Sequence, residues 1–136
     1  MEIFAELVTL AKEARDKAHA PYSGFAVGAA VRAKSGRTYT GCNVENASYG
    51  LAICAERVAI FKAVSEGERE FEALAVVTET LAPPCGACRQ VLAEFGLNIK
   101  VVIANLGEQR KVYTVGDLLP SAFTPQSLPS RPAEDQ

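Results

Sequence analysis

The sequence predicts a single α/β domain with three layers, in which helices cover both faces of a five-stranded mixed sheet. Apolar residues recur at helical spacing in the first segment of the chain, and two later segments also have helical character. Five shorter apolar segments have the character of strands. The resulting order of helix, two strands, helix, strand, helix, strand, strand is typical of a helix–sheet–helix fold.

The first half of the chain contains one helix and a hairpin. We expect an amphipathic helix over residues 2–18, because charges separate apolar residues there at helical spacing. The proline and glycine of APYSG end it. Residues 25–33 and 38–44 flank the sequence KSGR, whose Ser-Gly pair predicts the turn of a β-hairpin. Residues 45–53 lack apolar periodicity and predict a loop.

The second half alternates strands and helices. Residues 54–65 predict a helix whose apolar side chains cover most of its circumference, so we expect it to be buried. Residues 73–78 are continuously apolar, as in a strand covered on both faces. Residues 85–95 predict a third helix, ended by a glycine. Residues 100–105 and 111–115 predict the last two strands.

The length and composition indicate one domain. A chain of 136 residues with 49% hydrophobic residues fits one compact unit with a sizeable core, which we expect to span residues 1–124. Within it, residues 116–123 predict a short closing helix or turn. Residues 125–136 are polar and rich in proline, which predicts a mobile tail.

Charge and hydropathy exclude several classes of partner. The 14 basic and 16 acidic residues give a net charge of −2, and no basic run is present, which argues against binding to a nucleic-acid backbone. No apolar run reaches the roughly 18 residues that a membrane span needs. Glutamates interrupt the first apolar segment, so we expect no signal peptide and a cytoplasmic protein. A small, neutral or weakly charged ligand fits this composition better than a nucleic acid or a membrane does.

Four cysteines suggest metal or redox chemistry. In a reducing compartment, disulfides are not expected between Cys42, Cys54, Cys85 and Cys88. Cys85 and Cys88 form a Cys-x-x-Cys pair at the start of a predicted helix, after two prolines that keep the preceding chain extended. Both sulfurs then lie on one face of the helix, and its N-terminus favours thiolates. We expect Cys42 to be a small buried residue.

Cys54 also begins a predicted helix, and the two helices flank one strand. If both start at the same edge of the sheet, three thiolates meet and leave one coordination position open, as in a catalytic zinc site. Glu56 can face this site only if Cys54 caps its helix with non-helical backbone angles; it would then act in acid–base catalysis. Arg57 is placed to donate to a cysteine sulfur and offset the negative charge.

These motifs resemble the short, homotetrameric, zinc-dependent class of cytidine deaminases. The resemblance covers about residues 3–124 and rests on PYSGFAVGAA, GCNVENASYG, CAER and PPCGACRQVLAEF. It implies the fold of that family and the hydrolysis of cytidine and deoxycytidine to uridine, deoxyuridine and ammonia in pyrimidine salvage. It also implies one Zn²⁺ per chain, with a zinc-bound hydroxide attacking C4 of cytosine and Glu56 as the proton carrier, the general plan of zinc deaminases.

The resemblance also implies substrate contacts within the chain. Asn43 and Glu45 match positions that bind the ribose hydroxyl, and Phe25 matches the aromatic residue that packs on the pyrimidine ring. The backbone N–H of Ala55 would donate to O2 of the base. From the residues alone, Phe25 could instead be a core residue. Asn43 and Glu45 could have only a structural role in the turn after their strand. Ser23 is predicted to have only a structural role in its loop.

Other contacts are implied to come from neighbouring subunits of a homotetramer with shared sites. Ala47 and Tyr49 match residues supplied by one neighbour, and Phe123 matches an aromatic residue supplied by another. Two positions depart from the family pattern: Pro83 stands where serine is frequent, and Ser121 where glycine is common.

Three alternatives remain open at this stage. A blasticidin-type aminonucleoside deaminase would share the zinc motifs but act on another substrate. A zinc-stabilised interaction module would bind the ion without deamination and would have a fourth protein ligand. A thiol-redox protein would form a reversible disulfide between Cys85 and Cys88 without metal.

Overall fold

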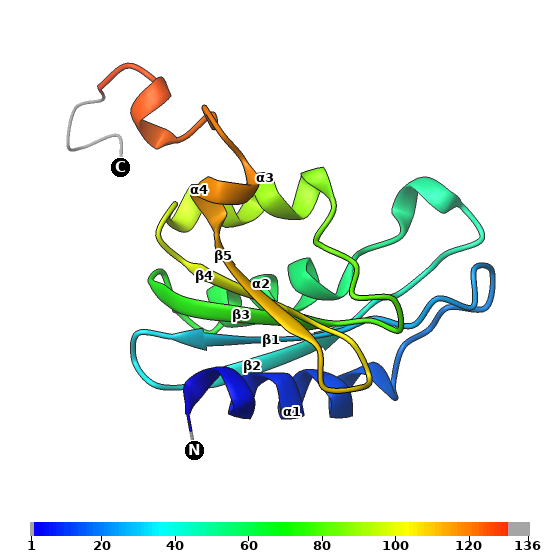
Figure 1. The fold of residues 1–136 in the computed structure, drawn as a ribbon. Helices are drawn as coiled ribbons and strands as arrows, with labels where there is room; N and C mark the ends of the chain where they lie inside the picture. The colour runs from blue at the N-terminus through cyan, green and yellow to red at the C-terminus, as the bar shows by residue number, and fades with distance from the viewer. Residues whose placement is uncertain (1, 131–136) are drawn as a thin grey trace.

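A computed structural model describes residues 2–130 of the chain (Figure 1). Its helices are α1 (Ile3–Arg15), α2 (Ala55–Ser65), α3 (Gly86–Phe95) and α4 (Val115–Leu118). Its strands are β1 (Gly28–Ala33), β2 (Thr38–Cys42), β3 (Phe71–Val77), β4 (Lys100–Ala104) and β5 (Arg110–Thr114). Two 3₁₀ turns cover Tyr49–Leu51 and Pro125–Ser127.

The strands form one five-stranded mixed sheet, as predicted, and their order in it is β2-β1-β3-β4-β5. β3 and β4 are parallel, and the other neighbouring pairs are antiparallel. β2 and β3 therefore run in the same direction, because both are antiparallel to β1, which lies between them. α2 connects β2 to β3 and α3 connects β3 to β4. Right-handed crossovers between strands of the same direction place both helices on one face, and both helices begin near the carboxyl-terminal edge of the sheet.

Helices cover both faces of the sheet, which confirms the predicted three layers (Figure 1). On one face α1 buries Leu7 and Ala11 against Ala30 and Ala75. On the other face α2 and α3 bury Ala59, Ile60, Leu92 and Ala93. Each of the large side chains among these contributes about 1.5–3 kcal/mol through burial.

Glycine allows two helices to approach the sheet closely. A Cβ atom added to Gly28 on β1 would lie 1.9 Å from the carbonyl oxygen of Ala11 in α1. A Cβ atom added to Gly41 on β2 would lie 2.6 Å from the backbone nitrogen of Ala59 in α2. Neither position has room for a side chain, so these glycines fix the spacing between the layers.

Two predicted boundaries were wrong by three residues. α1 ends at Arg15 rather than at residue 18, because the chain leaves the helix to form a bridge between His19 and Val44. β1 begins at Gly28 rather than at residue 25. The backbone N–H of Val27 donates to the side chain of Asn43 at 2.8 Å instead of to a neighbouring strand.

The C-terminal segment after α4 leaves the body of the domain (Figure 1). Its 3₁₀ turn at Pro125–Ser127 is capped by Thr124, whose backbone N–H donates to Ser127 Oγ at 3.1 Å. The predicted mobility of residues 125–136 stays a prediction, and residues 131–136 lie outside the described residues. Within residues 2–130, no helix combines the length and apolar character required to cross a membrane.

Candidate active site

Two helices begin with cysteine at the same edge of the sheet. Cys54 is the N-cap of α2, with φ −72° and ψ 153°. Cys85 is the N-cap of α3, with φ −68° and ψ 170°. Both backbones are extended at the cap. Cys54 therefore has the non-helical angles that allow Cys54 and Glu56, two residues apart, to face the same site. Cys88 follows one turn into α3 and is fully buried.

The three sulfur atoms lie at the spacing of zinc ligands. Cys54 Sγ is 3.7 Å from Cys85 Sγ, which is 3.6 Å from Cys88 Sγ, and all three lie within 4.8 Å of one another. Tetrahedral zinc with Zn–S bonds of about 2.3 Å would separate its sulfurs by about 3.8 Å. The donor set therefore fits Zn²⁺ with three protein ligands. Cys42 is outside this group and is half-buried, so the prediction that it is buried was wrong.

Hydrogen bonds shift the pKa values of Cys54 and Cys88 in opposite directions. Hydrogen bonds from Cys88, Arg57 and Cys85 lower the pKa of Cys54 to about 5. The hydrogen bond to Cys54, together with burial and the charge of Glu56, raises the pKa of the Cys88 thiol. These shifts favour a thiolate at Cys54 and a proton on Cys88. Since zinc binds thiolates, metal binding must release that proton.

Arg57 supplies a positive charge beside the cluster. Its Nη2 atom lies 3.5 Å from Cys54 Sγ and donates to it. The hydrogen bond to Cys54 raises the pKa of Arg57, so the side chain remains a cation. A guanidinium in this position reduces the net negative charge that three thiolates would bring to a divalent ion.

Glu56 is a buried acid in the first turn of α2. Its side chain is 4% exposed, although a carboxyl group is normally solvated. Burial, helped by the negative charge of Cys54, raises the pKa of Glu56 to about 7. Both the protonated and the ionised form are therefore accessible near neutral pH, as general acid–base catalysis requires.

A cavity of about 320 Å³ joins the cysteines and the acid to predicted substrate-binding residues. Cys54, Cys85 and Glu56 line it from the ends of α2 and α3. The lining also includes Phe25, Asn43 and Glu45. This volume is at the lower end of the range for small-molecule sites. One cavity therefore contains a candidate metal centre, a buried acid and an aromatic wall.

Comparison with known proteins agrees with this geometry. A family model described as the cytidine and deoxycytidylate deaminase zinc-binding region matches residues 1–105. This chain belongs to that family. The match includes all three cysteines of the cluster, and with their spacing it confirms the predicted zinc cofactor.

Individual members of the family match over most of their length. A cytidine deaminase from Sporosarcina psychrophila is 51% identical over 126 residues, which cover 90% of this chain and 93% of that protein. A cytidine deaminase from Halalkalibacterium halodurans is 51% identical over 125 residues, which cover 90% of this chain and 95% of that protein. A crystal structure of cytidine deaminase from Burkholderia pseudomallei has a TM-score of 0.86 at 52% identity, covering 90% of this chain and 100% of that one. These matches confirm the resemblance to cytidine deaminases and the predicted fold.

The predicted ribose-binding residues of this family member also hold a loop together. Asn43 Nδ2 donates to the carbonyl oxygen of Phe25 at 2.8 Å, and Asn43 Oδ1 accepts from Val27. The carboxylate of Glu45 accepts from the backbone N–H groups of Tyr22 and Ser23, and from the Ser23 hydroxyl. These bonds fix residues 22–27 beside the cavity. Carboxylate oxygens have several acceptor sites, so Glu45 retains the capacity to bind a ligand hydroxyl.

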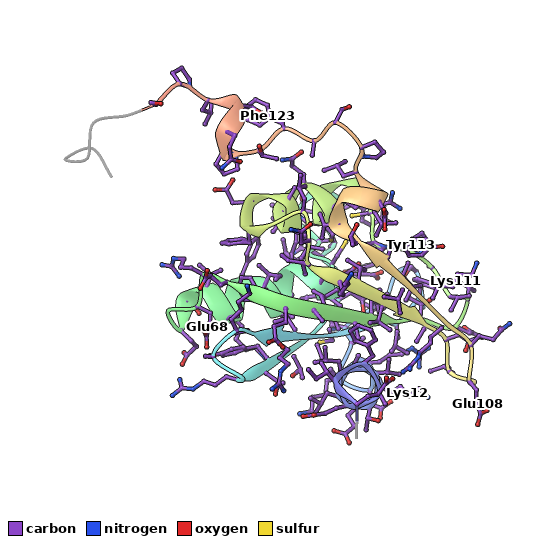
Figure 2. All side chains as sticks on the ribbon, turned by 60° about the vertical axis from the view of Figure 1, so that its left-hand side comes forward. Lys12, Glu68, Glu108, Lys111, Tyr113 and Phe123 are labelled. Carbon is purple, nitrogen blue, oxygen red and sulfur yellow. The ribbon has the colours of Figure 1, made fainter. Side chains whose placement is uncertain are left out.

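Ala55 lies inside the site, whereas the residues predicted to reach neighbouring subunits are exposed. Ala55 is fully buried at the first position of α2, where helical N–H groups lack partners within the helix. Ala47 is exposed, Tyr49 is 76% exposed and Phe123 is 58% exposed. Figure 2 shows Phe123 on the segment that leaves the domain. A single chain thus leaves these three side chains uncovered.

Two residues of the site were missed by sequence reasoning. Ser23 lines the cavity and its hydroxyl both donates to Glu45 and accepts from the backbone N–H of Phe25 at 3.0 Å. Thr78 also lines the cavity, is 2% exposed and accepts from the backbone N–H of Ala82 at 2.9 Å. The available signal for Thr78 was its polar side chain directly after the apolar residues 73–77. No local signal identified Ser23, because its partner lies 22 residues away.

Proposed function

We propose that the protein is a zinc-dependent hydrolase that deaminates cytidine and deoxycytidine to uridine and deoxyuridine, with release of ammonia. The observation that carries this proposal is the single cavity lined by Glu56 and by Cys54 and Cys85 of the three-sulfur cluster. A buried carboxylic acid beside three zinc ligands is costly for stability, and a role in proton transfer accounts for it.

Glu56 carries the protons in this reaction. Zinc held by the three sulfurs supplies a Lewis acid that activates water as a nucleophile. Glu56 accepts one proton from water and delivers it to N3 of the base as the water oxygen bonds to C4. It then takes the remaining proton from the new C4 hydroxyl group and delivers it to the amino group, which leaves as ammonia while the C4 carbonyl forms. The sum is cytidine plus water giving uridine plus ammonia. Arg57 remains positively charged and hydrogen-bonded to the sulfur of Cys54 throughout the reaction.

The substrate is oriented by residues on the other walls of the cavity. Phe25 packs on the pyrimidine ring, the backbone N–H of Ala55 donates to O2, and Asn43 and Glu45 bind the ribose. The lining of one cavity by Phe25, Asn43 and Glu45 supports these roles, as does the free helix N-terminus at Ala55.

The same proposal includes the assembly and the cellular role. We infer a homotetramer in which Ala47 and Tyr49 of one neighbour and Phe123 of another complete each site. The exposure of Tyr49 and Phe123 on the isolated chain supports this arrangement. Pyrimidine salvage in the cytoplasm follows from the substrate and from the free cysteines, which suit a reducing compartment.

Ammonia release from cytidine, measured with zinc content on the same preparations, tests the function. We expect turnover to rise in proportion to zinc, up to one ion per chain, and to disappear on chelation. Zinc without turnover on any nucleoside would instead indicate an interaction module. A reversible disulfide between Cys85 and Cys88 without bound metal would indicate a redox protein.

Competition between substrates separates the two deaminase alternatives. We expect cytidine and deoxycytidine to be deaminated faster than blasticidin S, because Asn43 and Glu45 offer a site for the ribose hydroxyl. Preference for blasticidin S would overturn the substrate assignment and leave the zinc chemistry intact.

A further inference from the structure

Arg89 is a half-buried residue of α3 whose guanidinium joins two distant backbone segments. Its Nε atom donates to the carbonyl oxygen of Pro84 at 2.8 Å. Its Nη1 atom donates to the carbonyl oxygen of Leu118, at the end of α4, also at 2.8 Å. The same residue thus contacts the loop that carries the zinc ligand Cys85 and the element that leads to the C-terminal segment.

Arg89 controls the backbone on both sides of Cys85. Its guanidinium binds the carbonyl group of Pro84, which precedes the cysteine, and its backbone N–H donates to the carbonyl oxygen of Cys85 at 3.0 Å. Pro84 is fully buried, so its carbonyl group would be costly to leave unpaired. Arg89 therefore fixes the orientation of both peptide groups from which the Cys85 side chain projects.

Of the three ligands, Cys85 depends most on such support. Cys88 is fully buried and is held by packing. Cys54 is half-buried and accepts a hydrogen bond from Arg57. Cys85 is exposed, and within residues 2–130 the hydrogen-bond contacts of its sulfur are to the other two ligands. Its position before the ion binds is consequently set by its backbone.

The next residue extends the connection to the C-terminal segment. Gln90 Nε2 donates to the carbonyl oxygen of Phe123 at 2.8 Å. Arg89 and Gln90 therefore hold the chain at Leu118 and at Phe123, one on each side of the left-handed backbone of Ser121, where φ is 54°. The helix that carries two of the zinc ligands is also the anchor of this segment.

We propose that Arg89 is a positioning residue that preorganises Cys85 for zinc and couples the zinc-ligand loop to the C-terminal segment bearing Phe123. This inference rests on the proposed zinc-dependent function. A planar guanidinium can bind two carbonyl groups in fixed directions, which the ammonium of lysine cannot do in the same way. Groups that orient a metal ligand without touching the ion typically change metal affinity about 10–100-fold.

The test measures the rate of zinc transfer from the full-length protein to a chromogenic chelator. Arg89→Met keeps the aliphatic length and removes both hydrogen bonds, so we expect zinc release about 10-fold or more faster than in the wild type. Arg69→Met is the matched control. Arg69 Nη1 also donates to two carbonyl oxygens, those of Val64 and Glu68, but at the opposite end of α2. We expect wild-type zinc release from this control.

Two further variants separate positioning from a general loss of stability. Arg89→Lys should release zinc at an intermediate rate, and it replaces Arg89→Met if that variant does not fold. Gln90→Met removes only the bond to Phe123. It should speed hydrogen exchange of the amides in residues 119–124 while zinc release stays at the wild-type rate, whereas Arg89→Met should speed both processes.

The outcomes distinguish this inference from the proposed function. If the wild type holds zinc and deaminates cytidine, but the Arg89 variants release zinc within twofold of the wild-type rate, the inference is wrong and the function stands. Equal acceleration by Arg69→Met would also overturn it, since the effect would then be one of overall stability. A wild type without zinc would overturn the proposed function and the inference with it.

Discussion

At the scale of single residues, the chemistry depends on where a few charges are buried. Glu56 is almost inaccessible to solvent, and Arg57, the next residue, donates to Cys54. Because Cys54 caps the helix, the residue two positions on faces the same cavity. A change of backbone conformation at one residue therefore brings a ligand and an acid to one site.

Replacement of Glu56 by glutamine tests the proton carrier. Glutamine has nearly the same shape but cannot accept or deliver a proton, so we expect turnover on cytidine to fall at least about 10²–10⁴-fold. Zinc content should stay at the wild-type level, because the three sulfurs that hold the ion are unchanged. Steady-state kinetics and metal analysis on one preparation check both. Near-normal turnover in a zinc-loaded variant would refute the assignment.

The spacing of residues in the sequence was sufficient to find the metal cluster but not the loop contacts around it. Cys85 and Cys88 lie three residues apart, and helix geometry alone brings their sulfurs together. The bonds from Asn43 and Glu45 to residues 22–27 cross 16 to 23 positions of the chain. Periodicity carries no information about such pairings, because they depend on how two loops meet after the sheet has formed.

At the scale of elements, contact between helix and sheet depends on small residues. α1 lies on a face where Ala30 and Ala75 present only methyl groups and Gly28 presents none. Its predicted end was too late because the pairing of His19 with Val44 outweighed local helix propensity. The helices and strands were thus predictable from their patterns, and their boundaries were not.

Gly28→Ala tests the close approach of α1 to β1. The added methyl group would lie 1.9 Å from the Ala11 carbonyl oxygen, so helix and strand must separate. Overpacking of this kind costs about 1–3 kcal/mol or more in the free energy of unfolding, which denaturant titration measures. Gly107→Ala is the control, because its nearest atom is a side-chain oxygen of Asn105 at 3.4 Å. An equal loss of stability in both variants would contradict the explanation.

The pH dependence of stability tests a contact between the loop that follows α2 and the hairpin formed by β1 and β2. Glu68, labelled in Figure 2, accepts from Tyr39 and Ser35 at 2.8 Å each, and these hydrogen bonds hold the pKa of Glu68 below its usual value. The ionised form is favoured in the folded state. The stabilisation is therefore present above the unfolded pKa, about 4.3, and is lost as pH falls through the lower folded pKa.

We accordingly expect Glu68→Gln to lower the melting temperature at pH 7, and we expect this effect to shrink as pH falls through the folded pKa of Glu68 and its carboxyl group becomes protonated. Glu66→Gln serves as the control, since residues 2–130 offer its side chain no hydrogen bond. Thermal melts at a series of pH values provide the measurement. A difference between wild type and Glu68→Gln that stays constant across the whole pH series would exclude this contact as its source.

At the scale of the whole molecule, a single chain has a metal centre and a cavity but leaves large side chains uncovered. Tyr49 and Phe123 are mostly exposed, and Phe123 lies on a segment that leads away from the sheet (Figure 2). Sequence patterns identify which residues are apolar. They do not tell which apolar residues a second subunit covers, so the proposed tetramer depends on family resemblance and on this exposure.

Mixing two impaired variants and assaying them at low cytidine concentration tests whether sites are shared between subunits. Phe123→Ala should raise the KM for cytidine and leave zinc content unchanged, because Phe123 is not a ligand. Chains with Glu56→Gln retain Phe123 but lack the proposed proton carrier. When both variants are unfolded and refolded together, some mixed sites regain both groups, and activity should exceed the mean of the separate samples. Activity equal to that mean would contradict shared sites.

We propose that zinc has three sulfur ligands from this chain and one position open to solvent or substrate. X-ray absorption at the zinc edge measures the ligands directly in the loaded protein. We expect three sulfur neighbours at about 2.3 Å and one oxygen or nitrogen neighbour at about 2.0 Å. Four sulfur neighbours, which would require Cys42 or another chain to close the site, would contradict the claim.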